Sequence, residues 1–270
     1  MSQQVLIAFL LTSFAGISTG IGSAIAFFAK RTNTSFLSLS LGFSTAVMIY
    51  MSFANLFASS VQTLCYMVRP MELFILHYLF FGGIILILLI DRLIPHYENP
   101  YEMHRMEEMD LKEERKIEIK PQLLRVGVVT ALVLAIHNFP EGMVTFLAAL
   151  KDVNIAIPIA FAIAIHNIPE GISVSVPVYY ATGNRKRAFW LSFLSGLAEP
   201  LGAVIGYLIL APFLNDHVSG VIFGMIAGIM VFISLDELLP AAEEYGKHHH
   251  AIYGLVAGMA VMALSLLMLG

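Results

Sequence analysis

Charge and cysteine are both scarce in this 270-residue chain. Charged residues make up 13% of the sequence, whereas soluble domains carry about 25%. The single cysteine, Cys65, excludes a small protein held together by internal disulfides. With 15 basic and 19 acidic residues, the chain also lacks the basic footprint of a nucleic-acid-binding protein. Hydrophobic residues account for 58% and the mean hydropathy is +0.81, which predicts a membrane protein.

The charges that are present cluster, which leaves long apolar stretches elsewhere. Of the 34 charged residues, 16 fall between Asp91 and Arg125. A bilayer core needs about 20 apolar residues per crossing helix. The sequence therefore predicts an all-α polytopic membrane protein with eight transmembrane helices. The predicted spans are Val5–Ala29, Phe36–Val61, Leu73–Ile90, Leu123–Leu150, Ile155–Ala181, Ala188–Leu214, Val218–Leu239 and Ala251–Leu269.

The basic residues predict how these spans are oriented. Alternate connections between the spans hold 13 lysines and arginines, and the opposite set holds only Arg69 and Lys151. Cytoplasmic loops carry the excess of basic residues. We therefore expect both termini to lie outside the cytoplasm and the charged segment, about residues 96–121, to be a cytoplasmic loop.

A repeated motif lies in the fourth and fifth predicted spans. The hexapeptide His-Asn-x-Pro-Glu-Gly begins at His137 and again at His166, 29 residues later. Consecutive spans run antiparallel, so two copies at the same depth can face each other across an approximate two-fold axis. Inverted repeats with a site near the bilayer midplane are a known transporter architecture.

Three glutamates fall near the middle of their spans. Glu141 and Glu170 belong to the two motif copies, and Glu199 is the single charged residue of the core of the sixth span. A charged carboxylate at the bilayer centre costs about 2.5–3.5 kcal/mol on insertion scales. No lysine or arginine lies at that depth in any span, so the balancing charge must come from protons or a metal cation.

The spacing of the motif residues favours a metal. In a helix, His137 shares a face with Glu141, four residues later, and Asn138 lies on the neighbouring flank; the second copy repeats this pattern. Imidazole nitrogens together with carboxylate oxygens suit Zn²⁺, Fe²⁺ or Mn²⁺. The candidate metal ligands are His137, Asn138, Glu141, His166, Asn167, Glu170 and Glu199.

These motifs resemble the ZIP family of divalent metal transporters, and in particular its bacterial zinc transporters. The resemblance includes both motif copies, SGLAE at Ser195–Glu199, PVYYATG after the fifth span and SLDELLP in the seventh. It implies an inverted-repeat bundle of eight helices in one domain, residues 1–270, with two metals held by the fourth, fifth and sixth spans. The implied ligands are His137, Glu141, His166 and Glu170 for the first metal, and Asn138, Asn167 and Glu199 for the second, with Glu141 and Glu170 bridging.

The resemblance also implies a function and a location. We expect import of divalent cations by alternating access, with zinc first and iron, manganese, cobalt or cadmium as further substrates. We expect no prosthetic group and a location in the bacterial inner membrane. The expected partners are metal ions and the lipid bilayer, and a homodimer is possible on this resemblance. One position departs from the family pattern: Asn55 stands where these transporters commonly carry a glutamate.

Two other functions are alternatives to a carrier. A divalent metal channel would use the same ligands and differ in the kinetics of flux. An intramembrane metalloenzyme would require an HExxH zinc motif or an equivalent with an open water position, and the sequence contains no HExxH. The sequence therefore favours a protein that is not an enzyme. Asp91 and Glu237 are candidates for the cytoplasmic exit path of the metal.

Overall fold

The computed structural model describes residues 3–28, 34–64, 70–93, 113–213, 215–245 and 248–269. Within these ranges the chain is helical with short connections and contains no strand. The elements are α1 (Gln3–Phe28), α2 (Thr34–Met51), η1 (Ser52–Phe57), α3 (Ala58–Leu64), α4 (Pro70–Leu93), α5 (Glu113–Lys151), α6 (Val153–Thr182), α7 (Arg185–Gly196), α8 (Ala198–Leu210), η3 (Ala211–Phe213), α9 (Asp216–Ile233), η4 (Ser234–Leu238), α10 (Leu239–Tyr245) and α11 (His248–Leu269).

The helices confirm a polytopic membrane protein. Seven helical stretches of the described residues are long and apolar enough to cross a membrane. The remaining predicted span corresponds to a shorter apolar stretch, Phe74–Ile90, within α4. Helix α4 has 24 residues and is about 36 Å long at 1.5 Å per residue, which exceeds the bilayer core. The total of eight spans and the orientation of the termini stay predictions.

Two predicted spans contain a π-helical turn. Ser52 begins η1 and Ser234 begins η4. The hydroxyl of each serine donates to the carbonyl oxygen four residues earlier, Ser52 to Met48 and Ser234 to Met230, both at 2.7 Å. Such side-chain bonds compete with the backbone N–H groups for helix carbonyls and bend helices. They accompany the local departure from regular α-helix at both places.

Two boundaries also differ from the sequence prediction. The sixth span is interrupted at Leu197, which separates α7 from α8. Pro200 has no N–H to donate to the carbonyl of Gly196, so the regular hydrogen-bond ladder is broken there. Helix α5 begins at Glu113, so residues 113–121 are helical where the sequence predicts a loop; the rest of that expected loop, residues 96–112, lies outside the described residues.

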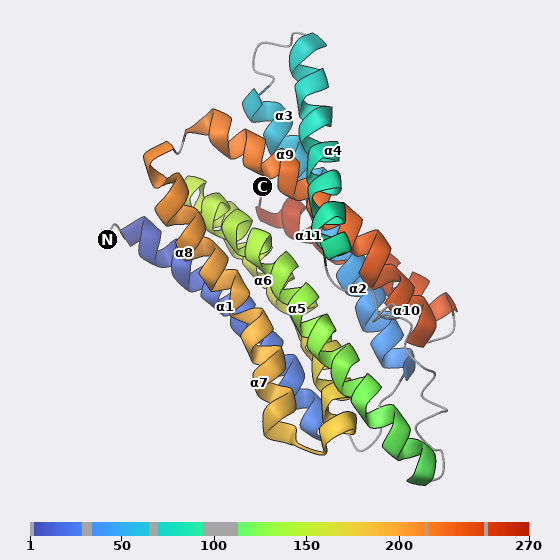
Figure 1. Cartoon of the computed structure of the whole chain (residues 1–270). Helices are drawn as coiled ribbons and strands as arrows, with labels where there is room; N and C mark the ends of the chain where they lie inside the picture. Colours follow the sequence, from blue (N-terminus) through green and yellow to red (C-terminus); the bar gives the residue numbers. More distant parts are fainter. Residues whose placement is uncertain are drawn as a thin grey trace.

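The helices form two groups, which lie side by side in Figure 1. The first helix group consists of α1 and α5 to α8, in which α6 packs extensively on α1 and α5, and α5 also packs on α8. The second helix group consists of α2 to α4 and α9 to α11, in which α2 packs on α11, and α9 packs on α3 and α4. The groups meet chiefly where α6 contacts α2. They are offset lengthwise: α7 and the start of α5 extend beyond the second group at one end, and α4 extends beyond the first group at the other.

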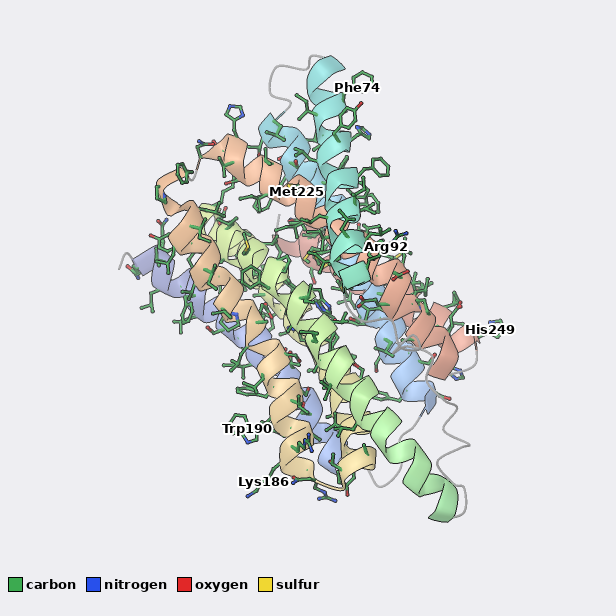
Figure 2. All side chains as sticks on the ribbon, viewed as in Figure 1. Phe74, Arg92, Lys186, Trp190, Met225 and His249 are labelled. Atoms are coloured by element: carbon green, nitrogen blue, oxygen red, sulfur yellow. The ribbon has the colours of Figure 1, made fainter. Side chains whose placement is uncertain are left out.

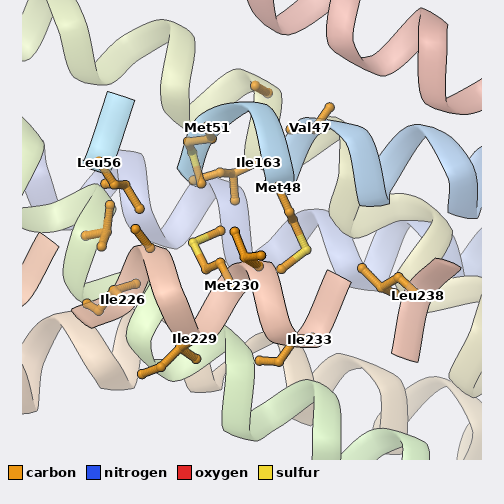
Figure 3. Close-up of a cluster of buried hydrophobic side chains, with 14 of the residues drawn as sticks. Val47, Met48, Met51, Leu56, Ile163, Ile226, Ile229, Met230, Ile233 and Leu238 are labelled. Carbon is orange, nitrogen blue, oxygen red and sulfur yellow. The ribbon is translucent and has the colours of Figure 1, made fainter. Parts of the chain in front are cut away.

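Apolar side chains fill the contact between the two groups and also cover the outer surface. Met48, Met51 and Met230 of the second group pack with Ile163 of α6, and all four are at most 1% exposed (Figure 3). We call these four residues the interface cluster. On the outside, large side chains such as Trp190 of α7 point away from the helices (Figure 2). An apolar surface of this kind suits contact with lipid.

Candidate metal centre

The two copies of the repeated motif face each other across α5 and α6. His137 Nε2 lies 3.3 Å from Glu170 Oε2, and His166 Nε2 lies 3.1 Å from Glu141 Oε1. All four side chains are at most 1% exposed. Each histidine therefore pairs with the glutamate of the other copy, as expected for a repeat that faces itself about a two-fold axis.

The glycine that ends each motif copy allows the neighbouring helices to approach this site. A Cβ atom on Gly142 of α5 would lie 1.8 Å from the carbonyl oxygen of Glu199 in α8. A Cβ atom on Gly171 of α6 would lie 2.0 Å from the carbonyl oxygen of Thr19 in α1. Only a residue without a side chain fits these contacts, so the sixth residue of each motif sets the distance between the site and its flanking helices.

Glu199 brings a third carboxylate to the site from the first turn of α8. Its Oε2 accepts a hydrogen bond from Asn167 Nδ2 at 2.9 Å, and the same amide group donates to the carbonyl oxygen of Ala15 at 3.0 Å. Asn138 Nδ2 donates to the carbonyl oxygen of Ser195, at 3.3 Å. The seven residues predicted as ligands thus all lie buried where α5, α6 and the α7–α8 break meet.

Several acceptor atoms in this site have no hydrogen-bond donor among the described residues. Buried polar atoms are normally paired, and leaving an oxygen unpaired away from water is costly. A group of unpaired oxygens from three helices is a suitable environment for a cation. Apart from Glu141 Oε1, which lies 3.1 Å from His166 Nε2, the unpaired acceptors are Asn138 Oδ1, Glu141 Oε2, Asn167 Oδ1 and Glu199 Oε1.

The charge of the site points in the same direction. Three carboxylates face only two histidines, and no lysine or arginine is buried among the residues whose side chains the structure describes. Even with both histidines protonated, one negative charge would stay unbalanced. A divalent cation supplies the missing positive charge without requiring any additional basic residue.

The side chains are not already arranged as a metal shell. Among the described residues, no three His, Cys, Asp or Glu side chains are placed so that they could hold a metal ion as they stand. The cause lies in the reciprocal pairs, because His137 and His166 direct Nε2 at carboxylates. A metal would have to take the place of these two contacts.

The second helix group adds two residues near the site. Ser44 Oγ of α2 donates to Glu170 Oε1, at 3.2 Å. Glu237 of η4 is 6% exposed and interacts electrostatically with His137. The sequence predicts Glu237 as part of the cytoplasmic exit path, but it gives no reason to select Ser44 among the many serines of its span. Asn55 lies in η1 and is half-buried, and the side chain of Asp91 lies outside the described part of the chain.

Comparison with known proteins finds similar sequences over nearly the whole chain. The sequence pattern of a family described as "ZIP Zinc transporter" matches residues 98–266. A protein named zinc transporter ZupT from Streptococcus mutans is 58% identical over 269 residues, covering 99% of both chains. Proteins of the same name from Clostridium perfringens and Lysinibacillus sphaericus are 56% and 54% identical, covering 98% and 100% of this chain and 97% and 100% of their own.

Proposed function

Because the chain belongs to the ZIP zinc transporter family, we propose that it imports zinc across the bacterial plasma membrane. The observation that carries this proposal is the set of unpaired, buried oxygens beside the two reciprocal histidine–glutamate pairs. In an apolar bundle such a set is costly unless protons or a cation balance its charge, and a divalent cation can occupy several of these oxygens at once. We therefore interpret the site as a binding site for a zinc ion that enters from one side of the membrane and leaves on the other.

The ligands divide into two metal positions. His137, Glu141, His166 and Glu170 hold the first metal, after each histidine turns its Nε2 from a carboxylate to the ion. Asn138, Asn167 and Glu199 hold the second metal through the oxygens that lack donors, and Glu141 and Glu170 bridge the two. Nitrogen and oxygen ligands of this kind also accept Fe²⁺, Mn²⁺, Co²⁺ and Cd²⁺, so these ions are further substrates.

Transport proceeds by a shift of the first helix group along the second. The lengthwise offset of the two groups in Figure 1 supports this motion. On the predicted orientation, Ser44 and Glu237 belong to the cytoplasmic halves of the helical stretches 34–64 and 216–245, so the site lies level with the cytoplasmic half of the second group, and we assign this arrangement to the inward-facing state. The interface cluster closes the path on the outer side, and the reverse shift opens it.

The chain requires no chemical step for this activity and acts without catalysis. Zinc exchanges its water for the buried ligands on one side and regains water on the other. The entire chain forms the single transport domain, and a second copy in the membrane is compatible with the exposed apolar surface of α4.

Zinc uptake by the purified protein in sealed proteoliposomes tests the proposal. We expect saturable uptake with a strong temperature dependence, which is typical of a carrier. Glu141→Ala should abolish uptake because it removes a bridging carboxylate. Insertion into the membrane should stay normal, because the substitution deletes a charge that is costly in the membrane. Glu243→Ala, which removes an exposed carboxylate on α10, is the matched control. Uptake by Glu141→Ala equal to that of Glu243→Ala would refute the site, and uptake that does not saturate would indicate a channel.

A further inference from the structure

Ser44 differs from neighbouring buried hydroxyl groups in its hydrogen-bond partner. Ser38 Oγ donates to the carbonyl oxygen of Ala242 in α10 at 2.6 Å, inside the second helix group. Thr45 Oγ1 donates to the carbonyl oxygen of Leu41 at 2.9 Å, and Ser52 Oγ donates to that of Met48 at 2.7 Å. Both bonds stay within one helix and are unaffected by movement between helices. The Ser44 hydroxyl instead donates across the boundary of the two helix groups to Glu170.

The acceptor of this bond is a carboxylate of the proposed metal site. Glu170 is held at both of its oxygens, at Oε2 by His137 of the first group and at Oε1 by Ser44 of the second. Both Ser44 and Glu170 are fully buried, so water does not compete for this bond in the present arrangement. The acceptor is a carboxylate, and hydrogen bonds to charged groups contribute more to stability than neutral ones, but at 3.2 Å this bond is longer than the strongest of that class.

We propose that Ser44 is a positioning residue that fastens the empty metal site to α2 while the site faces the cytoplasm. The inference rests on the proposed transport function, and it adds a coupling between one site carboxylate and the facing state. When the first group shifts to open outward, the Ser44–Glu170 bond must break. The hydroxyl therefore stabilises the inward-facing arrangement relative to the outward-facing one.

The size of the effect follows from the strength of the bond. Loss of a hydrogen bond to a charged group changes an equilibrium by about tenfold or more. Ser44→Ala should raise the outward-facing population of the empty protein by that factor, because a contact present in only one state biases the equilibrium by its full free energy. Thr45→Val, which also removes one buried hydroxyl from the same turn, should leave the population unchanged.

A cysteine in the interface cluster reports the outward-facing population directly. Met51 is fully buried here and would become accessible from outside when the groups shift. The reporter chain carries Met51→Cys with Cys65→Ser, and it is labelled in intact cells with an impermeant thiol reagent in the presence of a metal chelator. We expect labelling about tenfold faster with Ser44→Ala than without it. Ser44→Thr, which keeps the hydroxyl, should label at the rate of the reporter chain.

A double-mutant comparison separates the bond from general loosening of the helix packing. Glu170→Gln weakens the same bond by removing the charge of the acceptor, so adding Ser44→Ala to Glu170→Gln should raise labelling by much less than tenfold. Labelling of Ser44→Ala at the rate of the reporter chain, or equal acceleration by Thr45→Val, would overturn the proposal. Labelling needs no transport, so failure of zinc uptake in the parent would count against the proposed function alone.

Discussion

The closest helix contact at the metal site gives the sharpest prediction, which concerns Gly142→Ala. A Cβ atom at position 142 would lie 1.8 Å from the carbonyl oxygen of Glu199, whereas ordinary contacts begin near 3.4 Å. Helices α5 and α8 must then separate by about 1.6 Å, because the obstacle is backbone and cannot rotate away. Zinc–oxygen bonds of 2.0–2.2 Å tolerate deviations of only about 0.2 Å.

The expected result is loss of the metal position that depends on Glu199. Purified Gly142→Ala protein should bind about one zinc ion per chain where the parent binds two, and its zinc uptake should fall at least tenfold. Overpacking of this kind also destabilises a folded protein by about 1–3 kcal/mol, which a thermal unfolding measurement would detect. Elemental analysis of zinc per chain, measured beside uptake, tests the first part.

Gly82→Ala is the matched control for this experiment. A Cβ atom on Gly82 of α4 would have no atom within 4 Å, so the substitution should leave both metal stoichiometry and uptake unchanged. It should stabilise α4 slightly, since alanine is favoured over glycine in helices by about 1 kcal/mol. Two zinc ions per chain in Gly142→Ala, with uptake equal to that of Gly82→Ala, would refute the close-contact reasoning.

Two further predictions concern the second metal position and the orientation. Glu199→Gln keeps the volume of the side chain and removes one of three negative charges, so that one divalent ion neutralises the site. We expect about one zinc ion per chain by elemental analysis, together with partial uptake. Retention of both ions, or loss of both, would contradict the ligand division. In a Cys65→Ser background, Asp152→Cys should react with an impermeant thiol reagent in intact cells, and Gly183→Cys should be protected; reaction of Gly183→Cys from outside would reverse the orientation predicted from the basic residues.

The sequence predicts the position of this site well because the pattern is local. A histidine and a glutamate four residues apart share a helix face in any α-helix, and a second copy at the same depth in the next, antiparallel span can face the first. The structure accordingly brings the two motifs and Glu199 together. That these residues bind metal stays a prediction, since the histidines now contact carboxylates.

Other features depend on contacts between distant parts of the chain and have no local signal. Ser44 lies 126 residues before Glu170. The sequence around Ser44 does not distinguish it from Thr45 or Ser52, whose hydroxyl groups bond within their own helix. The π-helical turns likewise begin at serines that the sequence does not distinguish from others. The break at Leu197, in contrast, could be predicted from the sequence, because Pro200 has no N–H to complete the hydrogen-bond ladder of the sixth span.

The reciprocal pairing of α5 with α6 has a consequence for biosynthesis. These helices are joined by the single residue Asp152, and the two motif histidines lie fifteen residues before it and fourteen residues after it. A helical hairpin of this kind can enter the bilayer as one unit, with each carboxylate already beside the imidazole of the opposite arm. The hairpin thus lowers the cost of placing two acidic side chains in the membrane interior before the remaining helices assemble. We therefore expect nascent chains to insert without zinc.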